Sequence, residues 1–234
     1  MRALLLLALA VAFVPTQSAM AEMSWYIGGG GSFTTLESKG FAAQSGLESE
    51  LPPETAVSSF TLTSAQLKDS PLGWQVFGGL MFSKNFGVAI KYFDSGKAED
   101  NWDATLTETF LPPPSPPPDP NVTPLTYSGE LNIEGFTAYF VQTVPVSNSV
   151  DFSFQIGVTF QDLNFDWVET SASGLLSPNG SISRDDTGFA AAGVVRYRFW
   201  RNFAVSAELE YNSADFDGLI AKPLRFNLNG EIHF

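Results

Sequence analysis

Residues 222–234 read KPLRFNLNGEIHF and decide the fold. From Leu224 onward, every second residue suits a lipid-facing surface, and the residues between them are polar. The first set is Leu224, Phe226, Leu228, Gly230, Ile232 and Phe234, and the second is Arg225, Asn227, Asn229, Glu231 and His233. This alternation predicts a β-strand with one apolar and one polar face. A final strand of this kind fits the closure of a membrane-spanning barrel, because lipid tolerates no unpaired backbone groups at a sheet edge.

The other end of the chain predicts export. Met1-Arg2 precedes an apolar run over residues 3–14, and Ala19-Met20-Ala21 follows it. A basic start, a short apolar run and an A-x-A site are typical of a secretory signal peptide. A transmembrane anchor is the weaker alternative, because the run is shorter than the ~20 residues that a spanning helix needs. We therefore expect residues 1–21 to be removed and residues 22–234 to form one barrel domain.

The composition agrees with a barrel in a membrane. The chain has 21 phenylalanines among 234 residues and no cysteine, while its hydrophobic fraction of 44% is ordinary. Such a chain is too polar for a helical membrane protein and unusually aromatic for a soluble one. A lipid-facing apolar band, aromatic girdles and polar loops average to this composition.

Alternating segments predict an all-β fold, an eight-stranded antiparallel transmembrane up-and-down β-barrel. The expected strands are residues 24–33, 72–83, 86–94, 128–144, 150–164, 187–199, 203–211 and 222–234. Long loops are expected over residues 36–70 and 95–127 and around residues 171–180, with a shorter one at 212–221. Short turns on one rim and long loops on the other are the pattern of outer-membrane barrels.

Two segments are less regular. Glu130, Asn132 and Glu134 share one parity with Phe136 and Phe140, which predicts a bulge or a partly apolar end of the lumen. In the second long loop, six of the seven residues 112–118 are proline. This run forces extended polyproline II and excludes a strand. It is either a stiff loop crest or, less favoured, a docking ligand for an aromatic groove.

Three stretches resemble the OmpA-type family of eight-stranded outer-membrane barrels. They are WYIGGG at residues 25–30, GWQVFGG at residues 73–79 and the final Phe234. The resemblance spans the mature chain and implies residence in the outer membrane, among its lipids and lipopolysaccharide. It also implies that the barrel-assembly machinery recognises Phe234. No periplasmic domain follows the barrel in this sequence, so cell-wall tethering is not expected.

Charged residues on lumen parity predict a ladder of ion pairs. The basic members are Lys91, Arg196, Arg198 and Arg225, and the acidic members are Glu134, Glu208, Glu210 and Glu231. We expect Arg196 and Arg198 to lie beside Glu208 and Glu210 on the neighbouring strand. Charges removed from water must pair, and side chains nearly fill an eight-stranded barrel. A closed plug is therefore favoured over a gated pore.

Several functions are disfavoured by charge and residue content. The formal net charge is −13, and most of the acidic excess falls in the expected loops, so nucleic acid is not an expected partner. Those loops either share divalent cations with lipopolysaccharide phosphates or only repel one another. Lipid A deacylases and palmitoyl transferases share the architecture, but the sole histidine, His233, lies at the wrong end for such a site. No catalytic residue, metal site or cofactor is expected.

The leading functional prediction is a structural and surface-interaction barrel whose loops meet a host or phage surface ligand or neighbouring lipid. The alternative is a small OmpW-like channel or transporter for hydrophobic or small polar solutes. Phe77, Met81, Phe136 and Phe140, on lumen parity, are the residues that favour this alternative.

Overall fold

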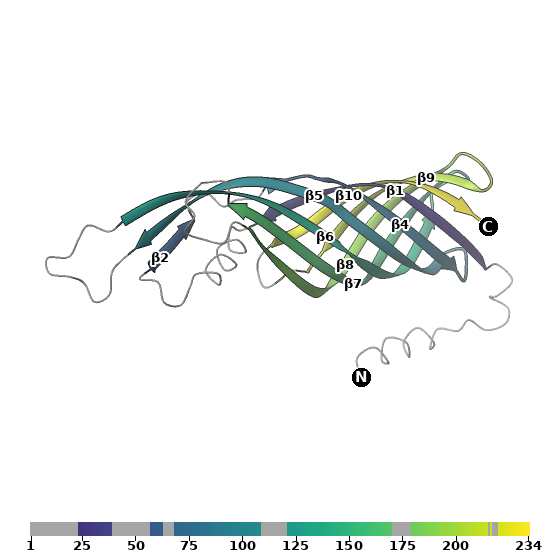
Figure 1. Cartoon of the computed structure of the whole chain (residues 1–234). Coiled ribbons are helices and arrows are strands. Elements are labelled where there is room, and N and C mark those ends of the chain that lie inside the picture. The colour runs from purple at the N-terminus through teal and green to yellow at the C-terminus, as the bar shows by residue number, and fades with distance from the viewer. Residues whose placement is uncertain are drawn as a thin grey trace, which may run out of the picture.

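The computed structural model describes residues 23–38, 57–62, 68–108, 121–169, 179–214, 216 and 220–234, which are almost entirely β-strand (Figure 1). The strands are β1 (Ser24–Ser38), β2 (Val57–Leu62), β3 (Lys68–Asp69), β4 (Leu72–Met81), β5 (Phe86–Glu108), β6 (Asn121–Pro145), β7 (Val150–Glu169), β8 (Asn179–Arg198), β9 (Phe203–Asn212) and β10 (Ile220–His233). Within these ranges, no helix is long and apolar enough to cross a membrane. The expected signal peptide and the proline-rich run lie outside the described residues.

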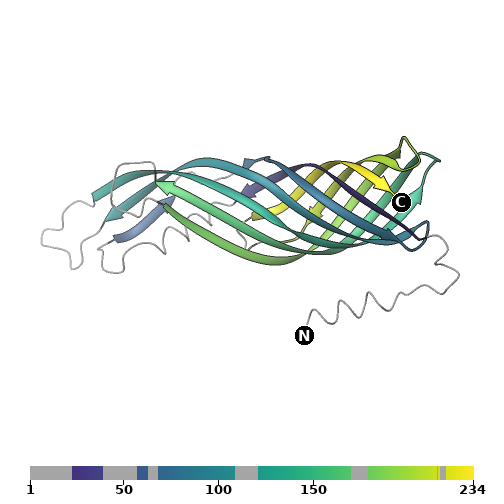
Figure 2. The same ribbon diagram turned by 45° about the vertical axis from the view of Figure 1, so that its right-hand side comes forward.

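Eight of the strands close into one antiparallel barrel. The order around the ring is β1, β4, β5, β6, β7, β8, β9 and β10, and β10 pairs back onto β1 (Figure 2). The closing register joins Tyr26 to His233 and Phe33 to Phe226. Closure satisfies both sheet edges, as lipid requires. The predicted eight-stranded barrel is confirmed, while the short strands β2 and β3 pair with β5 and β1 outside the ring.

Side chains alternate across the barrel wall with period two. On β10, Leu228 is 52% exposed on the outer face, whereas Arg225, Asn227 and Glu231 are buried inside. We call the end with the short turns 82–85, 146–149 and 199–202 the turn end, and the opposite end the loop end. At the turn end Trp25 stacks on Phe234 with ring centroids 3.9 Å apart. Exposed aromatic rings of this kind favour a membrane–water interface.

The glycine run of β1 makes room for inward-pointing side chains on the strands beside it. Gly30 lies between Gln75 on β4 and Asn229 on β10, whose side chains hydrogen-bond over it at 2.8 Å. A Cβ at Gly30 would lie 2.6 Å from the Asn229 Oδ1 atom, and one at Gly28 would lie 2.5 Å from the Phe77 ring. Glycine is therefore required here by the close approach of neighbouring groups.

Strands β5 to β8 are longer than predicted and extend beyond the rest of the barrel at the loop end (Figure 1). The expectation that residues 95–127 form a loop is wrong over 95–108 and 121–127, which belong to β5 and β6. Residues 165–169 and 179–186 are likewise strand, and β2 and β3 lie within the expected loop 36–70. Beyond the lipid a strand needs no apolar outer face, so the lipid-type alternation ends although backbone pairing continues.

From Glu130 to Val141 the two faces of β6 are the reverse of those predicted. Leu131 and Ile133 are buried inside, and Phe136, on the parity of Glu134, is 55% exposed outside. No register shift interrupts the pairing of β6 with β7, so the bulge expected in this strand is absent. Above the lipid boundary the apolar side chains turn inward and the polar ones meet water. The apolar end of the lumen is present, but Leu131 and Ile133 line it rather than Phe136 and Phe140.

A bulge does occur on the neighbouring strand β5. The register with β6 shifts between Asp94 and Lys97, and Gly96 adopts a φ of +76°. The Gly96 amide donates to Asp94 Oδ1 at 2.8 Å. A left-handed φ at an extra residue is suited to glycine. Before the bulge the odd-numbered residues of β5, such as Phe93, face the lumen. After it the even-numbered Ala98 faces the lumen, and both side chains are buried.

Candidate functional site

Charged side chains on the inner wall gather in two groups, of which the one nearer the loop end is the loop-side cluster. It comprises Lys91, Glu208, Glu210 and Arg225, whose side chains are at most 3% exposed. Lys91 pairs with Glu208 and, at 2.8 Å, with Glu210, while Arg225 pairs with the second oxygen of Glu210. Strands β5 and β9 lie four positions apart either way around the ring. Lys91 therefore bridges the lumen from one wall to the opposite one.

Aromatic rings cover the cations of this cluster. The Lys91 Nζ atom lies 5.1 Å from the ring centroid of Tyr139, and the Arg225 guanidinium carbon lies 3.4 Å from that of Phe93. The negative face of an aromatic ring attracts a cation, most strongly where water is excluded. The rings thus add attraction to that of the carboxylates.

The second group, the turn-side cluster, centres on Arg196. Its Nη1 donates to Asp151 at 2.8 Å and its Nε donates to Glu231 at 2.6 Å. Arg198 donates to the other oxygen of Asp151 at 2.6 Å, and the His233 ring lies 3.1 Å from Glu231. The side chains of Arg196, Asp151 and Glu231 are nearly inaccessible, whereas that of Arg198 is 46% exposed.

Small residues on β9 allow the turn-side cluster to form. Arg196 on β8 is paired with Ser206, and Glu231 on β10 is paired with Ala204. Both β9 side chains face the lumen and are short, so the arginine and the glutamate meet above them. The cluster thus joins β7, β8 and β10 across β9.

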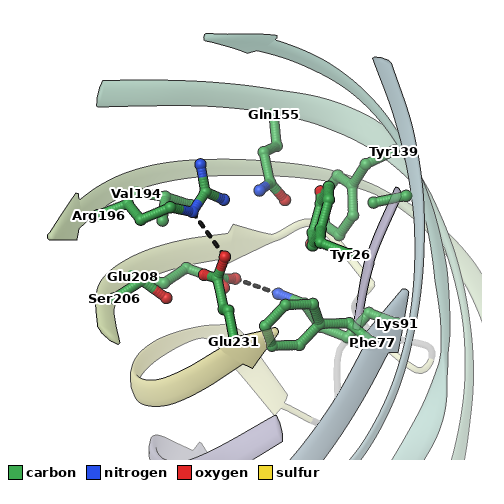
Figure 3. A pocket seen from close by; sticks show the side chains of 11 residues that line it. Tyr26, Phe77, Lys91, Tyr139, Gln155, Val194, Arg196, Ser206, Glu208 and Glu231 are labelled. Carbon is green, nitrogen blue, oxygen red and sulfur yellow. Dashed lines mark hydrogen bonds and ion pairs between the residues drawn. The ribbon is translucent and has the colours of Figure 1, made fainter. Parts of the chain in front are cut away.

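The two clusters leave little space between them. A cavity of about 10 Å³ separates them, with Lys91, Glu208, Arg196 and Glu231 in its wall (Figure 3). A cavity of about this volume holds a single water molecule. Each cluster sets two cations against two carboxylates and is therefore neutral with His233 uncharged. The arrangement obstructs the lumen at its middle with paired charges.

The lumen nearer the loop end is apolar. Its buried inward-facing side chains include Phe93, Ile133, Leu163, Phe165 and Trp167. The rings of Phe165 and Trp167 stack with centroids 5.4 Å apart. The charged clusters of the lumen lie in its middle and at the turn end, and uncharged polar residues such as Ser95 and Gln161 are buried beside the apolar part.

The structure brings together most of the residues that the sequence assigned to the lumen. Buried inside are Lys91, Arg196, Glu208, Glu210, Arg225 and Glu231, and half-exposed at the turn end is Arg198. The partners of the arginines differ from those expected. Arg196 and Arg198 bind Asp151 rather than Glu208 and Glu210, because the register sets them beside Ser206 and Ala204. Asp151 was missed, although it shares the parity of the inward-facing Ser153 at the start of β7.

The placement of Glu134 in the lumen is wrong. Glu134 lies on the outer face and accepts a hydrogen bond from the Tyr92 hydroxyl at 2.6 Å. Directly paired positions on β5, β7 and β8 hold Asp94, Asp162 and Asp185, so four carboxylates form one row across four strands. Among the described residues, no group of three or more histidine, aspartate or glutamate side chains is placed to hold a metal ion.

Comparison with known proteins identifies the family. A model of the outer membrane protein β-barrel domain matches residues 4–230. The chain belongs to this family. The predicted resemblance to OmpA-type eight-stranded barrels is confirmed, and membership implies the outer membrane. In such barrels the short turns face the periplasm and the longer loops face outward, so the turn end is the periplasmic end.

Solved structures share the fold of this outer-membrane barrel at low identity. Ail, the attachment invasion locus protein of Yersinia pestis, is 16% identical with a TM-score of 0.50, over 91% of this chain and 99% of Ail. OprG of Pseudomonas aeruginosa is 12% identical with a TM-score of 0.50, over 90% of this chain and 95% of OprG. The Escherichia coli protease OmpT is 8% identical with a TM-score of 0.41, over 91% and 96%, too distant to bear on catalysis. No curated protein matches the sequence.

Proposed function

We propose that this barrel is a closed, non-enzymatic scaffold that presents its loop end at the cell surface. The observation that supports a closed scaffold is the pair of neutral clusters that meet in the middle of the lumen. A conducting pore needs a continuous polar path, whereas here Lys91 joins opposite walls and Arg196 joins neighbouring ones. The loops are left to contact a host or phage surface ligand or neighbouring lipopolysaccharide.

Single-channel recording in planar bilayers tests the closed lumen. The refolded protein is expected to show no steady conductance, because the clusters leave room for only about one water molecule. A double variant, Lys91→Ala with Glu208→Ala, removes the bridge across the lumen and is expected to show brief openings. A steady conductance in the unmodified protein would contradict the proposal.

The row of carboxylates at the loop end indicates the charge of a surface partner. Asp94, Glu134, Asp162 and Asp185 lie side by side on the outer wall. Like charges directly opposite one another in a sheet are destabilising, so counter-charge is needed there. We propose that cationic groups, or cations held by lipopolysaccharide phosphates, lie against this row.

A channel or transporter for hydrophobic solutes remains a second candidate. Two of the residues that favoured this candidate in the sequence, Phe136 and Phe140, face outward, so they do not support a path through the lumen. The apolar outer lumen around Phe93, Leu163 and Trp167 now favours it instead. Uptake of a small hydrophobic solute by proteoliposomes, with no ionic conductance, would support this candidate over the closed scaffold.

We propose that Phe234 is the recognition end for barrel assembly and that residues 22–234 are the mature domain, released by removal of residues 1–21. The supporting geometry is local: the Phe234 amide donates to the Trp25 carbonyl at 2.9 Å, and the two rings stack. Phe234 thus contacts the first strand at the point of closure.

Deleting Phe234 is expected to slow insertion and to leave protein aggregated in the periplasm, because the last strand loses its recognition end and its contact with Trp25. The measurement is the amount of heat-modifiable barrel in outer-membrane fractions. Replacing Phe203, another exposed aromatic residue of the turn end, with alanine is the control and should have little effect. Normal barrel levels after the deletion would contradict the assignment.

A further inference from the structure

A row of directly paired positions crosses four strands of the inner wall in the middle of the barrel. It consists of Tyr26 on β1, Gly79 on β4, Ala89 on β5 and Tyr139 on β6. The two outer members are tyrosines, and the two between them are small. A Cβ at Gly79 would collide with the ring and the hydroxyl of Tyr26, so the Tyr26 side chain lies across that glycine. The small residues therefore leave room for a tyrosine to reach over the neighbouring strand.

The hydroxyls of both tyrosines are buried in the lumen. Tyr26 and Tyr139 are each only 3% exposed. Neither hydroxyl has a hydrogen-bond partner in the part of the chain that the structure describes. A polar group that leaves water without gaining a new partner is destabilising, and buried hydroxyls are almost always bonded. Two such hydroxyls in one place indicate a small ligand that accepts hydrogen bonds.

Both tyrosines line the cavity of about 10 Å³ that separates the loop-side and turn-side clusters (Figure 3). Glu208 of the loop-side cluster and Glu231 of the turn-side cluster belong to the same wall. Glu208 binds Lys91 through Oε1, and Glu231 binds Arg196 through Oε2. A carboxylate offers about four acceptor sites, so each glutamate can accept a further hydrogen bond. The cavity thus presents hydroxyl donors from one side and carboxylate acceptors from both clusters.

We propose that this cavity binds one water molecule that joins the two clusters. The water accepts hydrogen bonds from the hydroxyls of Tyr26 and Tyr139 and donates its own two to Glu208 and Glu231. A buried water typically makes about 2–4 hydrogen bonds and needs about 10–15 Å³, which matches the lining and the volume. Both clusters are neutral, so the cavity favours an uncharged ligand. The site lies inside the barrel, and its occupancy is independent of what the loops bind.

The direction of the stability change in Tyr26→Phe tests the site, measured by equilibrium unfolding in urea of the mature barrel refolded into lipid. If water bonds the hydroxyl, the substitution breaks that bond, and the unfolding equilibrium constant is expected to rise by about threefold to tenfold. If the cavity is dry, removing an unpartnered hydroxyl leaves stability unchanged or increases it, and that result would overturn the proposal. Tyr197→Phe, at an exposed tyrosine of the outer wall, is the matched control and should change the constant by about twofold at most.

The double variant Tyr26→Phe with Tyr139→Phe tests whether one water serves both hydroxyls. The first substitution already weakens the shared water, so the second is expected to cost less than it does alone. Effects that simply multiply would overturn the shared site. Heat-modifiable mobility checks that each variant folds.

A crystal structure of the unmodified barrel, at a resolution that reveals other ordered waters, observes the site directly. Density is expected within hydrogen-bond distance of the two hydroxyls and of Glu208 and Glu231. A cavity without density in such a structure would overturn the proposal.

Discussion

Replacing Glu210 with alanine is expected to destabilise the barrel by about 3–5 kcal/mol, the usual effect of removing one partner from a buried ion pair. The side chain of Glu210 is fully buried and binds both Lys91 and Arg225. Its loss leaves Arg225 without its carboxylate and Lys91 with Glu208 alone, in an interior where water has little room. The measurement is the free energy of unfolding in urea, with the protein refolded into lipid.

Glu130→Ala is the matched control for this change. Glu130 also pairs with a lysine, Lys97, at 2.5 Å, but on the outer wall, where the lysine side chain is 63% exposed. An exposed pair contributes about 0–1 kcal/mol because water already solvates both charges. Equal losses at Glu210 and Glu130 would show that the loop-side cluster is not sealed from solvent.

Replacing Arg196 with alanine is expected to produce a loss of similar size, about 3–5 kcal/mol. The change removes the cation that lies between the carboxylates of Asp151 and Glu231, which then repel one another across a confined space. Asp151 retains Arg198 as a cationic partner, whereas Glu231 retains the His233 ring. The same urea unfolding series in lipid measures the effect.

Arg198→Ala and Arg201→Ala are the controls for Arg196→Ala, because the three arginines lie close together in the chain and differ in exposure. Arg198 is half-exposed and shares Asp151 with Arg196. Replacing Arg198 is therefore expected to lower the free energy of unfolding clearly less than replacing Arg196. Arg201 lies exposed in the turn, and its replacement is expected to change stability by no more than about 0.5 kcal/mol. Equal, small losses at all three arginines would contradict the buried position of Arg196.

The sequence by itself determined the barrel, because the lipid-facing wall imposes a period-two pattern that each spanning strand must carry. The final strand, the eight-strand order and the inward parity of Lys91, Arg196 and Glu208 all follow from that pattern. The pattern also indicated which rim has short turns. These features depend on which face of a strand meets lipid, and neighbouring residues along the chain record that directly.

Only the tertiary structure decided which charges meet and where the strands end. Lys91 pairs with Glu208 on the opposite wall of the lumen, and Arg196 pairs with Glu231 above the short side chains of Ala204 and Ser206. Strand parity says that a side chain faces inward, but its partner depends on register and on the size of the residues between. Glu134 was misplaced because the apolar face changes sides where β6 leaves the lipid, and strand alternation alone does not mark that boundary.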